Sequence, residues 1–419
     1  MAAGTLGLLI LWSLKSPGTA LKALSIGILV TFINPAIAPA QPAASLMKWV
    51  LLFVASGRIV AARLQRGAVP QWMLSLAGFL TIAATLALFS SAAPGLSLLK
   101  LVTFSVGVVA TMWGFDGGDI DRQVFANWFL SLHAAVVIFS LPLLFLPFGY
   151  LRNGWAFQGL LNQPQALAIY LAPMTVALIH RGFFGQEGRG WVIPLGLASL
   201  VCMGASASRT GAVAMGVAGG LVALRKLAMS RPTTQPTRKF GFGKFYVLVI
   251  STVLLLLAFG GRITTFATQF IAKGTEVTTF SSVADLKDAS ASRSGQVEGN
   301  LTNFRAHPWV GVGFGMASEG GGGEVDYDPT LGLPLSAPTE PGFLPLAVLG
   351  QTGLIGGLAW LVFLLSILIP MATRTTIDLA LLGLAALAVN LGEMIFFSQG
   401  GLGLQMWILL GFVHACRDR

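Results

Sequence analysis

The sequence predicts an all-α integral membrane protein with about twelve transmembrane helices and one large loop between the ninth and the tenth. Two observations carry this prediction. Of the 419 residues, 55% are hydrophobic and only 10% are charged, whereas roughly 25% are charged in a soluble domain. Long apolar stretches also recur along the chain, and one polar segment, residues 261–341, interrupts them. This composition argues against a disordered chain, a mainly nucleic-acid-binding protein and a disulfide-rich secreted fold.

Each helix is predicted from the length that crosses a bilayer. A hydrocarbon core of about 30 Å needs about 20 mostly apolar residues in a helix, which satisfies the backbone amides internally. Residues 1–14 form an apolar stretch without the leader and cleavage site of a signal peptide, and we expect it to be interfacial or half-spanning; a full crossing would make thirteen spans. The twelve predicted spans are residues 20–37, 44–59, 71–91, 96–113, 124–147, 163–179, 191–203, 209–229, 245–260, 342–369, 377–397 and 401–416.

The orientation follows from the basic residues, because Lys and Arg in short loops are retained on the cytoplasmic side. The strongest cluster lies between the eighth and ninth spans and contains no acid: Arg225, Lys226, Arg231, Arg238, Lys239 and Lys244. Counting spans in both directions places the other basic loops on the same side: Lys15, Lys22, Arg58, Arg63, Arg66, Arg181, Arg189, Arg374, Arg417 and Arg419. Both termini are therefore predicted to be cytoplasmic, and residues 261–341 extracytoplasmic.

The chain is predicted to have three parts. Residues 1–260 form an N-terminal membrane bundle of nine spans plus the apolar N-terminal segment, residues 261–341 form a large periplasmic loop with short helices, and residues 342–419 form three C-terminal spans. Loops of this length are uncommon without a function. We therefore searched the loop and the outer ends of the spans for charged groups, because charges near membrane depth are costly and mark function.

Arg209 is the clearest such charge. It follows Ser208 at the predicted outer end of a span, among small residues that leave its guanidinium room to reach an anion. A planar and permanently charged fork suits a phosphate or a diphosphate. The alternative interpretation is an arginine that snorkels to the lipid head groups.

A second group of candidates lies in the loop. Arg293 precedes a predicted short helix over residues 296–306, which contains Arg305 and ends before Pro308. His307 is more compatible with a structural hydrogen bond than with a general base. The glycines that follow permit close approach of the backbone to a ligand, and they equally permit tight packing against a membrane helix; they are Gly311, Gly313 and Gly315.

The third element closes the loop at Glu340 and Pro341. Glu340 is predicted to lie where the tenth span begins, and Pro341 suits an early helical position. The carboxylate could be only a helix cap. The functional interpretation is a general base beside a cationic pocket.

These elements together resemble the superfamily of O-antigen ligases and of O-antigen and exopolysaccharide polymerases. The resemblance is specific from about residue 206 to residue 357 and architectural elsewhere. It rests on the pair Ser208-Arg209, on Arg293 ahead of the turn His-Pro-x-x-Gly-x-Gly-x-Gly at residues 307–315, and on Gly350-x-x-Gly353 in the span after the loop. Many members have His-Asn at the start of that span, where this chain has Glu340-Pro341, which favours a polymerase over the lipopolysaccharide ligase itself.

The resemblance implies a GT-C-like glycosyltransferase of the bacterial inner membrane with its active site facing the periplasm. Such an enzyme transfers a glycan from undecaprenyl diphosphate onto an acceptor hydroxyl of a glycan or glycolipid. By motif position, Arg209 and Arg293 would hold the diphosphate. Glu340, which stands where many members have His, would accept the hydroxyl proton, with inversion at the anomeric carbon. We expect no cofactor and no metal, because the acidic connection of Asp116, Asp119 and Asp121 is predicted to be cytoplasmic.

Two other classes of protein stay open. A twelve-helix transporter or lipid-linked glycan flippase would also have a basic pocket, but it would need ionisable groups at the midplane and broken helices in corresponding halves. The core spans contain almost no acids apart from Glu393, near the outer end of its span. Nothing in the sequence speaks for the third class, a non-catalytic scaffold of a secretion complex.

Overall fold

A computed structural model of the protein describes residues 2–39, 42–67, 69–116, 118, 120–152, 154–185, 190–229, 294–316, 326–327, 334–336 and 342–417. These residues form an all-α fold with one two-stranded antiparallel ladder, β1 (Asp326–Tyr327) with β2 (Pro334–Ser336). The helices are α1 (Ala2–Ser13), α2 (Pro17–Thr31), α3 (Pro42–Leu64), α4 (Gln71–Ser90), α5 (Pro94–Trp113), α6 (Arg122–Ser140), α7 (Pro164–Phe184), α8 (Val192–Ala205), α9 (Arg209–Met229), α12 (Ser294–Ala306), α13 (Leu344–Arg374), α14 (Ile377–Ala388) and α15 (Leu402–Ala415).

Six of the described helices are long and apolar enough to cross a membrane: α3, α4, α5, α7, α13, and α6 together with its 3-10 extension. Shorter apolar helices accompany them. Large apolar side chains face outward, for example Phe89 and Phe145, which are 87% and 84% exposed. Helix length and hydropathy thus identify a multi-pass membrane protein. The predicted span 245–260 lies outside the described residues.

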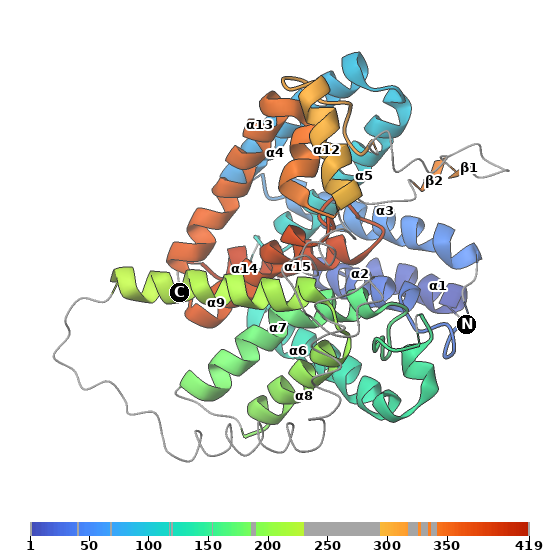
Figure 1. The fold of residues 1–419 in the computed structure, drawn as a ribbon, viewed down its shortest axis with the longest axis vertical. Helices are drawn as coiled ribbons and strands as arrows, with labels where there is room; N and C mark the ends of the chain where they lie inside the picture. The colour runs from blue at the N-terminus through green and yellow to red at the C-terminus, as the bar shows by residue number, and fades with distance from the viewer. Residues whose placement is uncertain are drawn as a thin grey trace, which may run out of the picture.

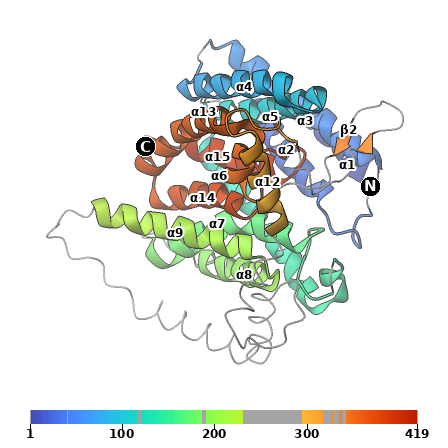
Figure 2. The same ribbon diagram turned by 45° about the horizontal axis from the view of Figure 1, so that its top comes forward.

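The C-terminal helices form the centre of the bundle. Figure 2 shows α13, α14 and α15 between α4 and α5 on one side and α7, α8 and α9 on the other. All fourteen residues of α15 are buried, as expected for a helix that is apolar on every face and surrounded by protein. The helices α1, α2 and α3 pack on one another at the N-terminal side (Figure 1). Helix α1 has twelve residues and is about 18 Å long, less than a full crossing.

One end of the bundle, here called the basic end, gathers the helix termini that carry the basic residues. Arg58 donates a hydrogen bond to the carbonyl of Leu14 at 3.0 Å, and Arg63 donates one to Gly114. Arg225 reaches the carbonyl of Thr375 at 3.0 Å, between α13 and α14. The chain from α2 to α9 and from α13 to α15 runs alternately toward and away from this end. Arg58, Arg63 and Arg225 therefore lie on one side of the molecule.

The opposite end, here called the turn end, contains helix ends and interruptions that correct four predicted spans. The predicted span 20–37 is α-helical only to Thr31. The predicted span 124–147 is α-helical only to Ser140 and continues as 3-10 turns. The predicted span 377–397 ends as α14 at Ala388, followed by a short 3-10 turn. The predicted span 342–369 begins later, at Leu344, and is broken at Gly353. Hydropathy predicts that these residues partition into lipid. It does not predict where a helix breaks because its backbone groups have hydrogen-bond partners outside the helix.

Candidate functional site

Arg209 lies at the turn end, as the first residue of α9. Three residues join α8 to α9, and the middle one, Ala207, has a left-handed backbone with φ of 51°. A non-glycine residue pays about 1–2 kcal/mol for this conformation, which clusters at functional sites. The neighbours Ser206, Ala207, Ser208 and Thr210 are buried, whereas Arg209 is half-buried. The strained link therefore presents one long cationic side chain at a helix N-terminus, where the helix dipole also favours an anion.

The start of α9 packs against the chain between α14 and α15, residues 389–401, here called the interrupted segment. A Cβ placed on Gly392 would lie 2.5 Å from the hydroxyl oxygen of Thr210, so the side chain of Thr210 packs directly against the backbone of Gly392. The next residue, Glu393, is half-buried. Glu393 follows Gly392 in the chain, so this contact brings an acidic residue of the C-terminal part close to the start of α9.

The interrupted segment is non-helical backbone that the side chain of Asn390 satisfies. The amide oxygen of Asn390 accepts hydrogen bonds from the N–H groups of Ile395 and Phe396, at 3.1 and 3.0 Å. The indole N–H of Trp407 in α15 donates to the carbonyl of Phe396 at 2.9 Å. Irregular backbone at membrane depth is tolerated where the protein supplies such partners. The interrupted segment thus has a defined conformation that buried side chains stabilise.

The break in α13 is the second interruption at this end. Gly353 has φ of 62° and ψ of −168°, a conformation that in effect only glycine adopts. A Cβ at this position would lie 2.3 Å from the backbone of Trp309. Trp309 belongs to residues 307–316, which follow α12 and are here called the glycine turn. The break therefore exists where a second backbone passes directly against the helix.

The glycine turn supplies the hydrogen bonds that the broken helix has lost. The N–H groups of Val312 and Gly313 donate to the carbonyls of Gly350 and Gln351, at 3.1 and 2.9 Å, and the N–H of Leu354 donates to the carbonyl of Pro308 at 2.8 Å. The side chain of Gln351 accepts from the N–H of Gly315 at 2.9 Å, and its nitrogen lies 3.7 Å from the sulfur of Met394 in the interrupted segment. Gln351 thereby links the glycine turn to the interrupted segment.

The glycines of the turn are used for packing. Gly311, Gly313 and Gly315 all have positive φ, and a Cβ on each would lie within 2.6 Å of Gln351, Ser91 or Lys100, respectively. Phe314, between two of them, is 1% exposed and packs against Phe397, with ring centroids 4.6 Å apart. Of the two roles that the sequence allows, the structure shows tight packing against a membrane helix.

The other predicted site residues are placed as follows. Arg305 is in the last turn of α12 and is exposed, and His307 is exposed directly after it. The backbone N–H of His307 donates to the carbonyl of Asn303 at 2.9 Å, which ends the helix. Arg293 and Glu340 lie outside the described residues. Because α13 begins at Leu344, the early-helix position expected for Pro341 is taken by Pro345.

Several polar residues of this site were not singled out by the sequence. Asn390 and Gln351 are buried and hold the two interruptions together. Lys100, near the start of α5, donates a hydrogen bond to the carbonyl of Gly315 at 2.6 Å and adds a second cation at this end. The available signal was the isolated polar residue inside an apolar stretch, beside a glycine, as in Asn390-x-Gly392-Glu393.

The arrangement can hold an anion at the turn end of the bundle. It combines the half-buried Arg209 at a helix N-terminus with two helix interruptions, one of which contains Glu393. The comparisons with known proteins found no matching family model, no matching curated protein and no matching solved structure.

Proposed function

We propose that the protein is a membrane glycosyltransferase that moves a glycan from undecaprenyl diphosphate onto the hydroxyl of an acceptor sugar. The favoured reaction is polymerisation of exopolysaccharide or O-antigen repeat units, with ligation to lipid A core as the alternative. The observation that carries the proposal is Arg209 at the end of the bundle remote from the basic end, next in the chain to Thr210, which packs against the interrupted segment that contains Glu393. A cation at the end of a membrane bundle is placed to bind the anionic head of a donor that diffuses within the lipid.

The sidedness of the site follows from the positive-inside rule. Because Lys and Arg of short loops stay in the cytoplasm, the basic end would face the cytoplasm and the turn end the periplasm. The proposal includes twelve spans, with the ninth at residues 245–260. An undecaprenyl-linked donor in the outer leaflet would then present its diphosphate at the level of Arg209.

The reaction would be a single displacement at the anomeric carbon. The bond from that carbon to the diphosphate oxygen breaks, a bond to the acceptor oxygen forms, and the acceptor proton passes to a carboxylate. The electron pair of the broken bond leaves with the diphosphate, and Arg209 and Arg293 would stabilise its charge. Stabilisation of developing charge is commonly the largest catalytic contribution. Inversion at the anomeric carbon follows from the single step.

Two carboxylates compete for the role of proton acceptor. Glu340 has the position in the sequence that the family resemblance favours, four residues before the first residue of α13. Glu393 is the acid that the described structure brings to the start of α9. Both are kept as candidates, because the variants described below separate them.

The first experiment removes the anion site. In host cells that lack the gene, each variant is expressed and the length distribution of the cell-surface glycan is measured. We expect Arg209→Gln to lower transfer by about a hundredfold or more, the typical effect of losing one oxyanion-stabilising donor. Arg209→Lys should keep part of the activity, because it retains the charge but not the fork. Arg152→Gln is the matched control, since Arg152 is an exposed arginine outside the site.

Near-normal polymer from Arg209→Gln, at equal amounts of inserted protein, would remove the diphosphate site. The second experiment compares Glu340→Gln, Glu340→His and Glu393→Gln. Loss of transfer in one Gln variant identifies that residue as the base. Recovery of transfer in Glu340→His would show that position 340 has the role of the family's His. Full activity of both Gln variants would exclude a carboxylate base.

The glycan that accumulates without the gene separates the remaining alternatives. Single repeat units on the lipid carrier indicate a polymerase, and long unligated chains indicate a ligase. A transporter or flippase would leave the lipid-linked glycan on the cytoplasmic side, and the purified protein would form no glycosidic bond.

A further inference from the structure

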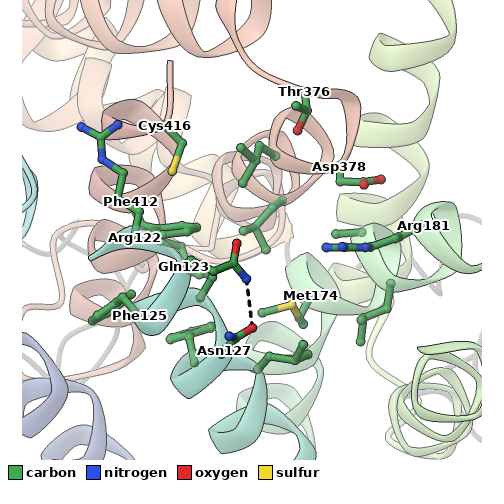
Figure 3. Close-up of a pocket in the computed structure, with 18 of the residues that line it drawn as sticks. Arg122, Gln123, Phe125, Asn127, Met174, Arg181, Thr376, Asp378, Phe412 and Cys416 are labelled. Carbon is green, nitrogen blue, oxygen red and sulfur yellow. Dashed lines mark hydrogen bonds between the residues drawn. The ribbon is translucent and has the colours of Figure 1, made fainter. Parts of the chain in front are cut away.

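At the basic end, side chains of five helices line a partly open cavity of about 350 Å³ that the proposed reaction does not use. Its walls come from α6, α7, the start of α8, the start of α14 and α15 (Figure 3). It lies at the opposite end of the bundle from Arg209. Its volume is within the range of small-molecule sites in proteins.

The floor of the cavity is apolar. It is formed by Phe125 and Phe129 of α6, Leu178 of α7, Leu382 of α14 and Phe412 of α15, all of which are buried. Such a surface favours the hydrocarbon part of a ligand, because apolar contact removes it from water. An ion that is fully hydrated gains nothing from these walls.

The rim of the cavity is polar and carries more positive than negative charge. Arg181, in the last turn of α7, directs its guanidinium toward the cavity, and Arg122 starts α6 at the other side (Figure 3). Gln123 and Asn127 hydrogen-bond to each other at 3.1 Å. The acid of the rim, Asp378, is engaged at 2.6 Å by the ring nitrogen of His180.

Among the described residues, little negative charge neutralises the two arginines of the rim. Within the part of the chain that the structure describes, neither Arg122 nor Arg181 makes a side-chain hydrogen bond or an ion pair, although Asp116 attracts Arg122 at longer range. Cations above an apolar floor, at the end of a membrane bundle, complement a ligand with an anionic head and a hydrocarbon tail. A zwitterionic head group would offer less net attraction.

We propose that this cavity binds one anionic phospholipid from the leaflet at the basic end. Its phosphate lies beside the guanidinium of Arg181, and Arg122 adds positive charge from the other side of the rim, with its side chain directed away from Arg181 (Figure 3). Part of one acyl chain occupies the floor while the remainder stays in the bilayer. Gln123 and Asn127 provide uncharged hydrogen-bonding groups for the head group. This site is independent of the proposed glycan transfer, because no residue of the candidate site at the turn end lines it.

The test uses the full-length protein in detergent and measures lipid binding by native mass spectrometry. The probes are phosphatidylglycerol and phosphatidylcholine with the same acyl chains. We expect tighter binding of phosphatidylglycerol, and we expect Arg181→Gln to weaken it about fivefold, from about 1 kcal/mol per basic residue near an anionic head group. Lys15→Gln is the control, because Lys15 is an exposed basic residue outside the cavity. It should leave the affinity unchanged.

A second pair of variants tests the floor. Ala126→Phe fills the cavity from α6 and should weaken both lipids, whereas Ala77→Phe adds the same side chain at an exposed position of α4 and should weaken neither. Equal binding of the two lipids by the unaltered protein would overturn the proposal. So would equal effects of Arg181→Gln and Lys15→Gln, equal effects of the two Phe variants, or complete displacement of phosphatidylglycerol by inorganic phosphate, which would indicate a site for free anions.

Discussion

The basic end and the turn end of this bundle differ in how the backbone groups at helix ends find hydrogen-bond partners. Every helix end leaves backbone groups without partners, and lipid cannot supply any. At the basic end, helices stop and long side chains reach the neighbouring backbone, as Arg58 does to Leu14 and Arg225 does to Thr375. At the turn end, helices are interrupted inside the bundle, and a second stretch of backbone or a buried amide satisfies the interruption, as at Gly353 and Asn390.

This difference indicates what each end can do. Contacts made by flexible side chains leave space between helix ends, and the cavity beside Arg181 occupies such space. Contacts made by backbone against backbone leave none, because a single Cβ at Gly311 or Gly353 would collide. The turn end is therefore rigid and suited to hold Arg209 in one position, as a positioning-dependent reaction requires. The basic end is suited to accept a lipid.

The largest effect is expected from Gly353→Ala. Alanine would need a left-handed backbone and would place its Cβ against Trp309, so helix and glycine turn have to separate. We expect a loss of at least about 3 kcal/mol in the free energy of unfolding, measured by denaturant titration in detergent. Gly78→Ala is the control, because Gly78 in α4 has no atom within 4 Å of the added Cβ. If Gly353→Ala and Gly78→Ala have the same free energy of unfolding, the inference that the turn end is rigid is wrong.

A smaller effect is expected from Asn390→Ala, which leaves the buried N–H of Phe396 without an acceptor and leaves the N–H of Ile395 only the carbonyl of Glu393, at 3.0 Å. Each unsatisfied buried group costs about 1–3 kcal/mol. Its counterpart at the basic end is Arg58→Ala, which removes an exposed hydrogen bond to Leu14 and should cost less than about 1 kcal/mol. Asn390→Asp keeps the acceptor oxygen, and its loss of stability should lie between those of Asn390→Ala and Arg58→Ala. Equal costs for Asn390→Ala and Arg58→Ala would abolish the distinction between the ends.

The fold was predictable from sequence where the helices are regular. The predicted span 209–229 has the bounds of α9, and the predicted span 71–91 differs from α4 by one residue. Both are apolar segments with clear boundaries, so hydropathy and helix length suffice. The breaks in α13 and after α14 were not predicted, because Gly353 and Gly392 allow a helix, a close packing contact or a turn equally well in the sequence.

The site was predictable only in part. Arg209 stood out because a charge in a small-residue setting near a membrane end is unusual. The glycine turn was recognised, but its partner was not, since the contact between Gly313 and Gln351 joins residues on two different elements. Asn390 lay unnoticed inside a predicted span, and Glu393 was noted there only as an isolated acid. Pairing between distant backbone segments is a property of the tertiary structure, and local sequence patterns do not encode it.

The smallest effect is expected at the basic end, from Asp116→Asn. Burial raises the pKa of the Asp116 carboxyl, and the hydrogen bond from Trp72 and the charges of Arg417, Arg63 and Arg122 offset this only in part. The folded protein therefore keeps the Asp116 proton to a higher pH than the unfolded chain does. As pH rises from below the ordinary pKa of aspartic acid through the raised pKa, ionisation of this carboxyl lowers the free energy of unfolding. The asparagine still accepts from Trp72 and does not titrate.

Asp116→Asn should consequently be more stable than the unaltered protein at neutral pH, by less than about 1 kcal/mol because the group is partly solvated. The two proteins should converge below the ordinary pKa of aspartic acid, where both side chains are neutral. Melting temperatures in detergent across this pH range measure the difference. A lower stability of Asp116→Asn at neutral pH would mean that the four neighbours hold a carboxylate, and that the basic end is stabilised by charge pairing as well as by hydrogen bonds to backbone carbonyls.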